Sequence, residues 1–592
     1  MKNRIINRMK KILTIAILGG LAMTMYAVPA RRGWQTRTQA DGTTIEIQQM
    51  GDEFYHYMIN RDGKEVREAD GMYIETGEAP TAQEASARRA RGMARRQRKA
   101  VGLTPNLAPK GVVILANFAD SEMEADHNQD IFKQLCNSSN CTVNKYGDKY
   151  YGSAAQYFSD QSNGAYRPQF DVFGPVTLSR KVEYYGKDKD GSDEGDDQHA
   201  TDAVVEACLL ANAQFDIDFT QYDSDKDGYV DFVYVIYAGK GQADGGAATT
   251  IWPHNWEIED AIRSGYCTYQ KSQCVVDGKK LNTYAMSGEL NGYNGTFNGI
   301  ATLCHEFGHV MGLPDLYDTS YGTVYKNCLT PNDWDVMDGG TYNGDGHCPP
   351  NYNPWEKQFF GWDNTEALGN VGKRLELLPN GTEGAKAYQI NSRGTLMGAT
   401  DAGLRYYIEN RQNVGWDAEL PAHGMLVWKV DFTANAWQNN APNNSSTTGA
   451  PLFTIVSATG TKIGWDGKND NSPMNPFPGS GKVTSWTPAG ITGKPVKDIT
   501  ETDGVISLIY IGVYKVNWVV NGETVETGEY STSGSDLLEL PSAAVTPCEG
   551  TRFAGWTEEA EWLDPFAAPA DIFTSADGRK VTGDKTYYAV FE

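Results

Sequence analysis

The chain has 592 residues, 40% of them hydrophobic, and a formal net charge of −24 at pH 7. Single hydrophobic cores usually stop growing near about 250 to 300 residues, so we expect several domains. An acidic surface repels nucleic acid and anionic membranes, which argues against both as partners and is typical of an extracellular protein.

Residues 1–30 have the pattern of a secretory signal peptide. Basic residues precede an apolar run from Ile12 to Ala22, and Val28-Pro29-Ala30 fits a small-residue cleavage site, with Ala27 as the alternative. No later apolar stretch is long enough to form a transmembrane segment. The sequence therefore predicts an exported protein that is secreted, with attachment to the cell surface left open.

Nine cysteines in an exported chain predict disulfides with one thiol left over. Cys208 lies in an apolar helical pattern and is expected to be a buried thiol. The shortest loops would be closed by three pairs: Cys136 with Cys141, Cys267 with Cys274, and Cys328 with Cys348.

Residues 31–108 are interpreted as a propeptide with a small strand-rich unit, because residues 43–48 and 54–58 alternate in polarity. Its end, from Arg88 to Lys99, is strongly basic. We expect this run to be exposed and cut by a trypsin-like protease, and the alternative is simply a basic helix face. The propeptide contains no cysteine, so latency would require an acid or a steric plug.

Residues 109–375 alternate strands with helices and are predicted to form an α/β domain. Apolar runs at 112–118 and 232–237 indicate strands, and residues 201–211 have a helical pattern. The candidate active-site helix, near residue 300, should pack on the resulting twisted sheet.

An acidic loop precedes the second of these strands. Aspartates at its first, third, fifth and ninth positions and glycine at the sixth copy a calcium-binding loop, but Tyr234 replaces the glutamate usual at position twelve. The alternative is a solvated acidic turn. The candidate calcium ligands are Asp223, Asp225, Asp227, the Tyr229 carbonyl and Asp231.

The strongest signal is the run from His305 to Asp315. His305 and His309 are four residues apart and share one face of a predicted helix, so both imidazoles can reach one ion. Glu306 follows the first histidine and is the candidate general base, taking a proton from water at the metal. The opposite face carries an apolar stripe at Ile300, Leu303, Phe307 and Val310.

Gly312 can end this helix in a left-handed conformation, and Pro314 prevents it from resuming. The turn brings back Asp315 as a third zinc ligand and leaves the fourth position of a tetrahedral site open, which is typical of a catalytic metal. A distant glutamate such as Glu356 is the alternative third ligand.

Three motifs together resemble the immune inhibitor A family of bacterial secreted, metzincin-like metalloproteases. They are His305-Glu306-Phe307-Gly308-His309, residues 312–318 and Trp334-Asp335-Val336-Met337-Asp338. The resemblance implies a zincin-like catalytic domain, with His305, His309 and Asp315 as zinc ligands and Glu306 as the catalytic glutamate. Asp318 is the alternative to Asp315.

Two later residues are candidates for supporting roles. Met337 is similar to the methionine of a Met-turn, which packs beneath the metal. Tyr342 is a candidate oxyanion stabiliser, the role of a tyrosine in some metzincins.

Alternating strands after residue 375 predict a β-sandwich accessory domain at 376–510 and a separate small module at 511–592. The module resembles the β-grasp-like repeats of internalin-type bacterial surface proteins. Such modules act as spacers or bind ligands, so a host or cell-surface molecule is the candidate partner.

These observations predict a multidomain protein: an α/β zincin-like catalytic domain followed by all-β domains. The predicted function is a secreted zinc metalloendopeptidase that hydrolyses extracellular proteins, made as a zymogen. The competing interpretation is a surface adhesin whose protease domain is vestigial.

Overall fold

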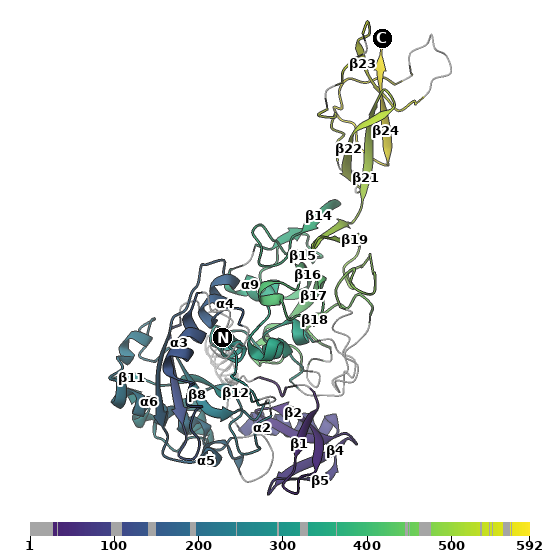
Figure 1. Cartoon of the computed structure of the whole chain (residues 1–592). Helices are drawn as coiled ribbons and strands as arrows, with labels where there is room; N and C mark the ends of the chain where they lie inside the picture. Colours follow the sequence, from purple (N-terminus) through teal and green to yellow (C-terminus); the bar gives the residue numbers. More distant parts are fainter. Residues whose placement is uncertain are drawn as a thin grey trace, which may run out of the picture.

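Figure 1 shows the computed structural model, with a small N-terminal sheet at one end and the C-terminal sheet at the other. The structure describes residues 28–592 apart from residues 32, 96–108, 140–149, 190–196, 244, 293–294, 320–329, 363, 445–447, 449, 461–474, 533–535, 544, 548, 561–568 and 570. Most of the predicted signal peptide and the proposed activation site after Arg95 therefore lie outside the described residues. Within the described part, no helix is long and apolar enough to cross a membrane.

The N-terminal region forms an antiparallel five-stranded sheet in the order β1-β2-β3-β4-β5, followed by one helix. The strands are β1 Gln35–Thr38, β2 Thr44–Asp52, β3 Tyr55–Asn60, β4 Lys64–Ala69 and β5 Met72–Glu78, and the helix is α2 Ala82–Arg95. The expectation of an exposed basic run is wrong for Arg89, which is 2% exposed and forms an ion pair with the buried Asp52 at 2.5 Å.

The central region is built on a five-stranded sheet in the order β7-β6-β8-β12-β9, parallel except for the antiparallel edge strand β9. Its strands β6 and β8 are largely apolar, as expected for strands that are covered on both faces. The strands are β6 Gly111–Asn117, β7 Phe170–Thr177, β8 Phe232–Lys240, β9 His254–Glu257 and β12 Thr283–Leu290.

The helices of this region are α3 Gln129–Asn137, α4 Ala154–Gln161, α5 Val182–Gly186, α6 Ala200–Phe215, α7 Ile258–Ser264, α8 Ala301–Val310 and α9 Pro354–Phe360. A short hairpin pairs β10 Val275–Val276 with β11 Lys279–Lys280. These elements confirm the expected strands at 112–118 and 232–237 and the helix at 201–211, each within a few residues.

The region that follows the central one, called the second region below, consists of two sheets that share one core. A five-stranded sheet has the order β13-β15-β16-β17-β18, and a three-stranded sheet has the order β14-β20-β19. Buried residues of both sheets pack together, including Leu377, Ile408 and Leu508. The bounds are β13 Glu366–Leu368, β14 Lys373–Leu377, β15 Tyr388–Asn391, β16 Gly403–Arg411, β17 Gly424–Phe432, β18 Phe453–Ile455, β19 Val496–Thr502 and β20 Val505–Tyr510, with the short helix α10 Ala434–Gln438.

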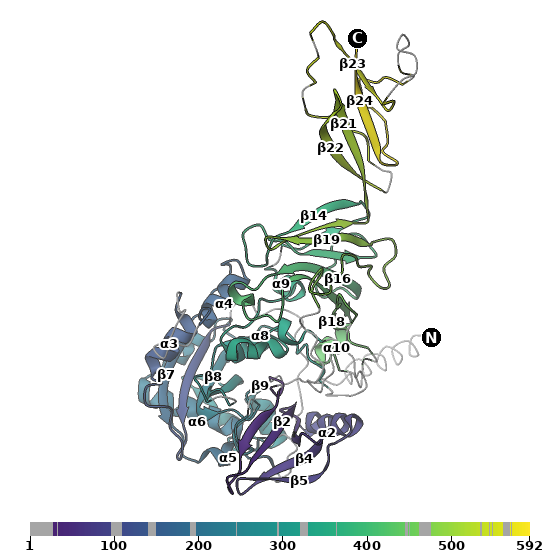
Figure 2. The same ribbon diagram turned by 45° about the vertical axis from the view of Figure 1, so that its right-hand side comes forward.

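The expected domain boundary at residue 375 falls inside β14, and β13 pairs with β15. The opposite face of the five-stranded sheet packs on the central region. Along β17, Met425 and Val427 belong to the core between the two sheets, whereas Leu426 and Trp428 belong to the core that contains α8. Figure 2 shows α8 between the central sheet and the strands of this second region.

Residues 513–592 form a four-stranded sheet in the order β22-β21-β24-β23. Its strands are β21 Val513–Val520, β22 Glu523–Ser531, β23 Phe553–Thr557 and β24 Lys585–Phe591. The sheet has its own small core around Trp518 and Trp556. Its resemblance to internalin-type repeats stays a prediction.

The cysteines of the described residues are all thiols, and Cys208 is buried as expected. Cys267 and Cys274 contact each other through their side chains without a disulfide bond. Cys141 and Cys328, members of the other two expected pairs, lie outside the described residues.

Candidate metal centre

Helix α8 carries both histidines, four residues apart. Leu303 and Phe307 of its predicted apolar stripe are buried in the core, and the sequence prediction of a helix here is confirmed. The histidine side is buried as well, with His305 at 0% and His309 at 4% exposure. The helix is therefore enclosed on all sides, whereas an amphipathic pattern predicts one solvent-facing side.

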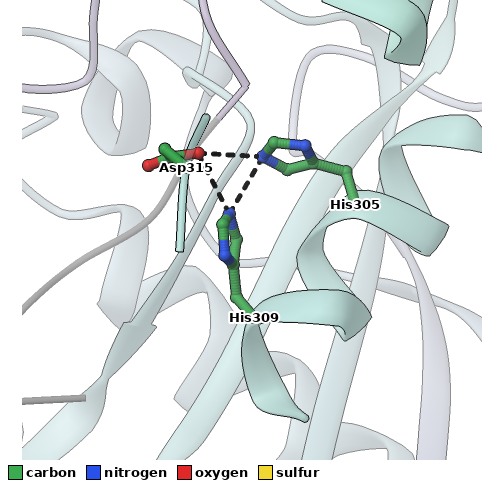
Figure 3. Close-up of side chains that lie close together, drawn as sticks. All are labelled: His305, His309 and Asp315. Atoms are coloured by element: carbon green, nitrogen blue, oxygen red, sulfur yellow. Dashed lines mark hydrogen bonds and ion pairs between the residues drawn. The ribbon is translucent and has the colours of Figure 1, made fainter. Parts of the chain in front are cut away.

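The imidazoles of His305 and His309 converge on the carboxylate of Asp315 (Figure 3). The two Nε2 atoms are 3.0 Å apart, and Asp315 Oδ1 lies 3.4 Å from His305 Nε2 and 3.3 Å from His309 Nε2. Asp315 Oδ1 has no hydrogen-bond partner among the described residues. Two imidazole nitrogens and one carboxylate oxygen in this arrangement fit a tetrahedral zinc ion with one position left for water or substrate.

The second nitrogen of each imidazole fixes the tautomer. His305 Nδ1 donates to the Val336 carbonyl at 2.7 Å, and His309 Nδ1 donates to the Leu313 carbonyl at 2.8 Å. A carbonyl oxygen can only accept, so each Nδ1 carries the hydrogen and each Nε2 presents a lone pair. Burial lowers the pKa of His309 to about 4, which keeps its imidazole neutral at neutral pH.

The loop after α8 places Asp315 as predicted. Gly312 has φ of +105°, and the Leu313 N–H donates to the Gly308 carbonyl at 3.0 Å, which ends the helix. Burial alone would raise the pKa of Asp315, but the two histidines outweigh it and lower the pKa below the ordinary value. Asp315 is therefore ionised and available as a ligand.

Glu306 is completely buried beside the three candidate ligands. Burial is the main cause that raises its pKa well above the ordinary value, followed by the negative charges of Asp315 and Glu53. The Val28 backbone N–H approaches the carboxylate, but neither carboxylate oxygen has a hydrogen bond of normal geometry among the described residues. In this covered state the side chain favours the protonated form.

Met337 packs against α8 at Gly308, which lies between the two histidines in the sequence. A Cβ at Gly308 would lie 3.0 Å from Met337 Sδ, so glycine lets the turn approach the helix closely. The turn is fixed by Asp335, whose Oδ1 accepts from the Met337 N–H at 2.8 Å. The Met337 carbonyl in turn accepts from the Leu316 N–H at 2.9 Å, next to Asp315.

The alternative third ligands lie elsewhere. Glu356 accepts from the Asn353 N–H at 2.9 Å in a capping box at the start of α9, and it is not grouped with the histidines. Asp318 is buried but is likewise outside the group.

Tyr342, the candidate oxyanion stabiliser, donates from its hydroxyl to the Pro29 carbonyl at 2.5 Å.

The acidic loop brings together Asp223, Asp225 and Asp227, whose oxygens lie within 4.8 Å of one another. Asp231 is turned away and accepts from the Ser224 N–H and hydroxyl and from the Lys110 N–H. The Lys279 ammonium contacts Asp223 at 2.6 Å. Three of the five candidate calcium ligands are therefore clustered beside a lysine.

Sequence reasoning missed the residues that approach the site from far along the chain. Val28 and Glu53 come from the N-terminal region, and Asn440 of the second region contacts Asp315 directly. No local pattern marks them, because their roles depend on contacts between domains. The asparagine-rich stretch 439–444 is the one compositional signal in this set.

Comparison with known proteins finds similarity in the central region. Residues 113–367 match the family profile described as the catalytic domain of immune inhibitor A peptidase M6. Immune inhibitor A of Bacillus thuringiensis subsp. alesti is 30% identical over 228 residues, which are 35% of this chain and 31% of that protein. The pre-pro-metalloprotease PrtV of Vibrio cholerae serotype O1 is 27% identical over 248 residues, or 36% and 25% of the two chains.

The converging histidines and aspartate lie within residues 113–367, the part of the chain that is similar to the catalytic domain of the immune inhibitor A peptidases. The alignments span about a third or less of the relatives' own length.

Proposed function

We propose that this protein is a secreted zinc-dependent metalloendopeptidase with a zincin-like catalytic domain, made as a zymogen. The observation that carries the proposal is the convergence of His305, His309 and Asp315 beside the buried Glu306. Zinc fits this donor set of two neutral imidazoles and one ionised carboxylate. The similarity of residues 113–367 to the peptidase family supports the same reaction, hydrolysis of peptide bonds in extracellular proteins.

When bound, zinc supplies Lewis-acid chemistry, polarising a carbonyl and acidifying water. The three ligand residues hold the metal, and Glu306 is the group that accepts a proton from water and delivers it to the leaving amine. A general base must be ionised before it acts. Removal of the N-terminal segment that covers Glu306 would let solvent in and lower the pKa of Glu306, because burial is the main cause of its elevation.

The contacts that residues 28–30 make with the rest of the chain support the proposal of a zymogen. Val28 and Ala30 are buried, and the Val28 carbonyl accepts from Trp252 Nε1 at 3.1 Å. The Ala30 N–H donates to the Gly51 carbonyl at 2.9 Å, which ties this segment to the N-terminal sheet. The contacts of Val28 and Ala30 persist after export only if the signal peptide is cut after Ala27, the alternative site, because a cut after Ala30 would remove them. Residues 31–108, which bring Glu53 near Glu306, are proposed as the propeptide, a steric plug released by a cut within residues 88–108.

Tyr342 is proposed to stabilise the oxyanion that forms during hydrolysis. Its hydroxyl donates to a peptide carbonyl of the covering segment, at Pro29. The same donor would be free for a substrate carbonyl once that segment has left. Met337 is proposed as structural support beneath the metal.

Calcium remains a second predicted metal, bound at Asp223, Asp225 and Asp227. Three carboxylates so close together repel one another, and a divalent cation would relieve this repulsion. We expect calcium to raise the melting temperature of the wild-type protein and not that of Asp225→Asn. Equal shifts in both proteins would contradict this site.

The proposal is tested with casein and two proteins, each cut within residues 88–108: the wild type and Glu306→Gln. We expect the wild type to hydrolyse casein and the variant to lose turnover while keeping its zinc, measured by elemental analysis. Glutamine preserves the shape of the side chain and removes only its basicity. Hydrolysis by the variant would refute the assigned role of Glu306.

The competing function is a surface adhesin that uses residues 511–592 to bind a host or cell-surface molecule. It predicts that neither cut protein hydrolyses casein. The intact set of ligand residues and the buried glutamate favour the peptidase.

A further inference from the structure

A loop from the second region lies against the loop that carries Asp315. It consists of residues 439–444, directly after α10. Asn443 Nδ2 donates to the Leu316 carbonyl at 2.5 Å, and Asn444 Nδ2 donates to Thr319 Oγ1 at 3.1 Å. Both asparagines are buried. This asparagine loop therefore follows the ligand loop over several residues.

The first contact of the asparagine loop is with the candidate ligand itself. Asn440 Nδ2 donates to Asp315 Oδ2 at 2.6 Å, and Asn440 Oδ1 accepts from the Asp315 N–H at 2.7 Å. The second bond needs an oxygen and the first needs a donor, so the amide has only one possible orientation. Asn440 is 1% exposed and has φ of +48°, a left-handed conformation that asparagine adopts more readily than most residues.

The two carboxylate oxygens of Asp315 have different partners. Oδ2 is held by the amide, and Oδ1 is the atom that faces both histidine Nε2 atoms. The side chain of Asp315 is thus fixed with one oxygen toward the metal position. Partners of this kind orient a ligand before the metal arrives, and their loss typically costs about 10- to 100-fold in metal affinity.

The location of Asn440 makes this contact unexpected. It is 125 residues beyond Asp315 and lies outside residues 113–367, the part that matches the peptidase family. We propose that Asn440 is a positioning residue of the metal site, so that the second region completes the site through the carboxylate of Asp315. The inference rests on the proposed zinc site and adds a residue to it.

The test measures zinc affinity by competition with a chelator, using the full-length wild type, Asn440→Asp and Asn440→Ala. Aspartate has the same shape as asparagine but cannot donate to Oδ2 when ionised. We expect both variants to bind zinc about 10- to 100-fold more weakly than the wild type. Asn439→Ala is the matched control and should leave the affinity unchanged, because Asn439 is only partly buried and its side chain, among the described residues, donates only to Asn435 in α10.

The melting temperatures of the metal-free wild type and variants show whether a substitution also destabilises the fold. A loss of zinc affinity without a lower melting temperature indicates positioning. A role in packing alone would leave Asn440→Asp with the affinity of the wild type, whatever happens to Asn440→Ala. Wild-type affinity in Asn440→Asp would therefore overturn the inference and leave the proposed function standing. A wild-type protein that binds no zinc would instead overturn the proposed function, and this inference with it.

Discussion

Asp335 and Glu356 are two buried carboxyl groups next to the Met337 turn of the candidate metal site. Asp335 accepts from the Met337 N–H and from Asn353 Nδ2, and Glu356 accepts from the Asn353 N–H. Burial raises the pKa of Asp335 to about 6, and burial together with Asp335 raises the pKa of Glu356 well above the ordinary value. Glu356 therefore keeps its proton at neutral pH, and Asp335 is the ionised member that holds the Met337 turn.

This pair predicts a pH dependence of stability. An acid whose pKa is raised by folding stabilises the folded state at low pH, and that stability is lost as the pH rises through the folded-state pKa. Glu356→Gln cannot ionise and can still accept from the Asn353 N–H. We expect the melting temperature of the wild type to fall relative to that of Glu356→Gln between about pH 5 and pH 8, measured by scanning calorimetry.

The control is Glu376→Gln, a change of the same chemistry at an exposed position of β14. Its melting temperature should follow that of the wild type across the pH range. Parallel curves for Glu356→Gln and the wild type would mean that ionisation of the pair is not linked to folding.

At the residue scale, the sequence was informative wherever the geometry is local. His305, His309 and Asp315 lie within eleven residues, and the helical repeat and the glycine turn suffice to bring them together. Asn440 and Glu53 were missed because their approach depends on how whole regions pack. Asp318 and Glu356 remained alternatives for the same reason, since only the fold separates them from the histidines.

Among the elements, α8 depends on the absence of a side chain at Gly308. A Cβ there would lie 3.0 Å from Met337 Sδ and 3.1 Å from the Tyr352 hydroxyl, both fully buried. Gly308→Ala should gain helix propensity but overpack this contact, with a net loss of about 1 to 3 kcal/mol. We expect a lower melting temperature and weaker zinc binding, measured by calorimetry and chelator competition.

The companion change Gly308→Ala with Met337→Ala tests the cause. Removing the thioether makes room for the added methyl group, so the double variant should lose less stability than the two single changes predict by addition. If the stability losses of the two single variants simply add in the double variant, the side chains at positions 308 and 337 do not interact.

Predictions for the elements succeeded where apolar runs were long and failed where partners came from elsewhere. Strands β6 and β8 were found because both faces are buried and the runs are continuous. The basic pattern of α2 indicated an exposed helix face, but Arg89 has a buried partner, Asp52, at the end of the distant strand β2. Such a pairing has no signature in either segment alone.

The whole molecule consists of an N-terminal sheet with its helix, two closely packed regions, and a C-terminal module with a core of its own. Residues 513–592 have a core of their own and reach the rest of the chain through contacts such as the Arg374–Glu529 ion pair. Surface ion pairs contribute about 0 to 1 kcal/mol. Deletion of 513–592 should therefore leave casein hydrolysis by the cut protein within about twofold of the full chain. Loss of hydrolysis would show that the module takes part in catalysis or folding.

The two-sided burial of β17 bears on how the protein can be produced. A recombinant fragment that ends near residue 367 would lose the sheet whose residues Leu426, Trp428 and Val430 pack on the central core. The fragment would expose the apolar surface that those side chains cover, and exposed patches of this kind promote aggregation. The region that matches the peptidase family is thus not expected to fold alone, and soluble expression calls for a chain that continues to about the end of β20.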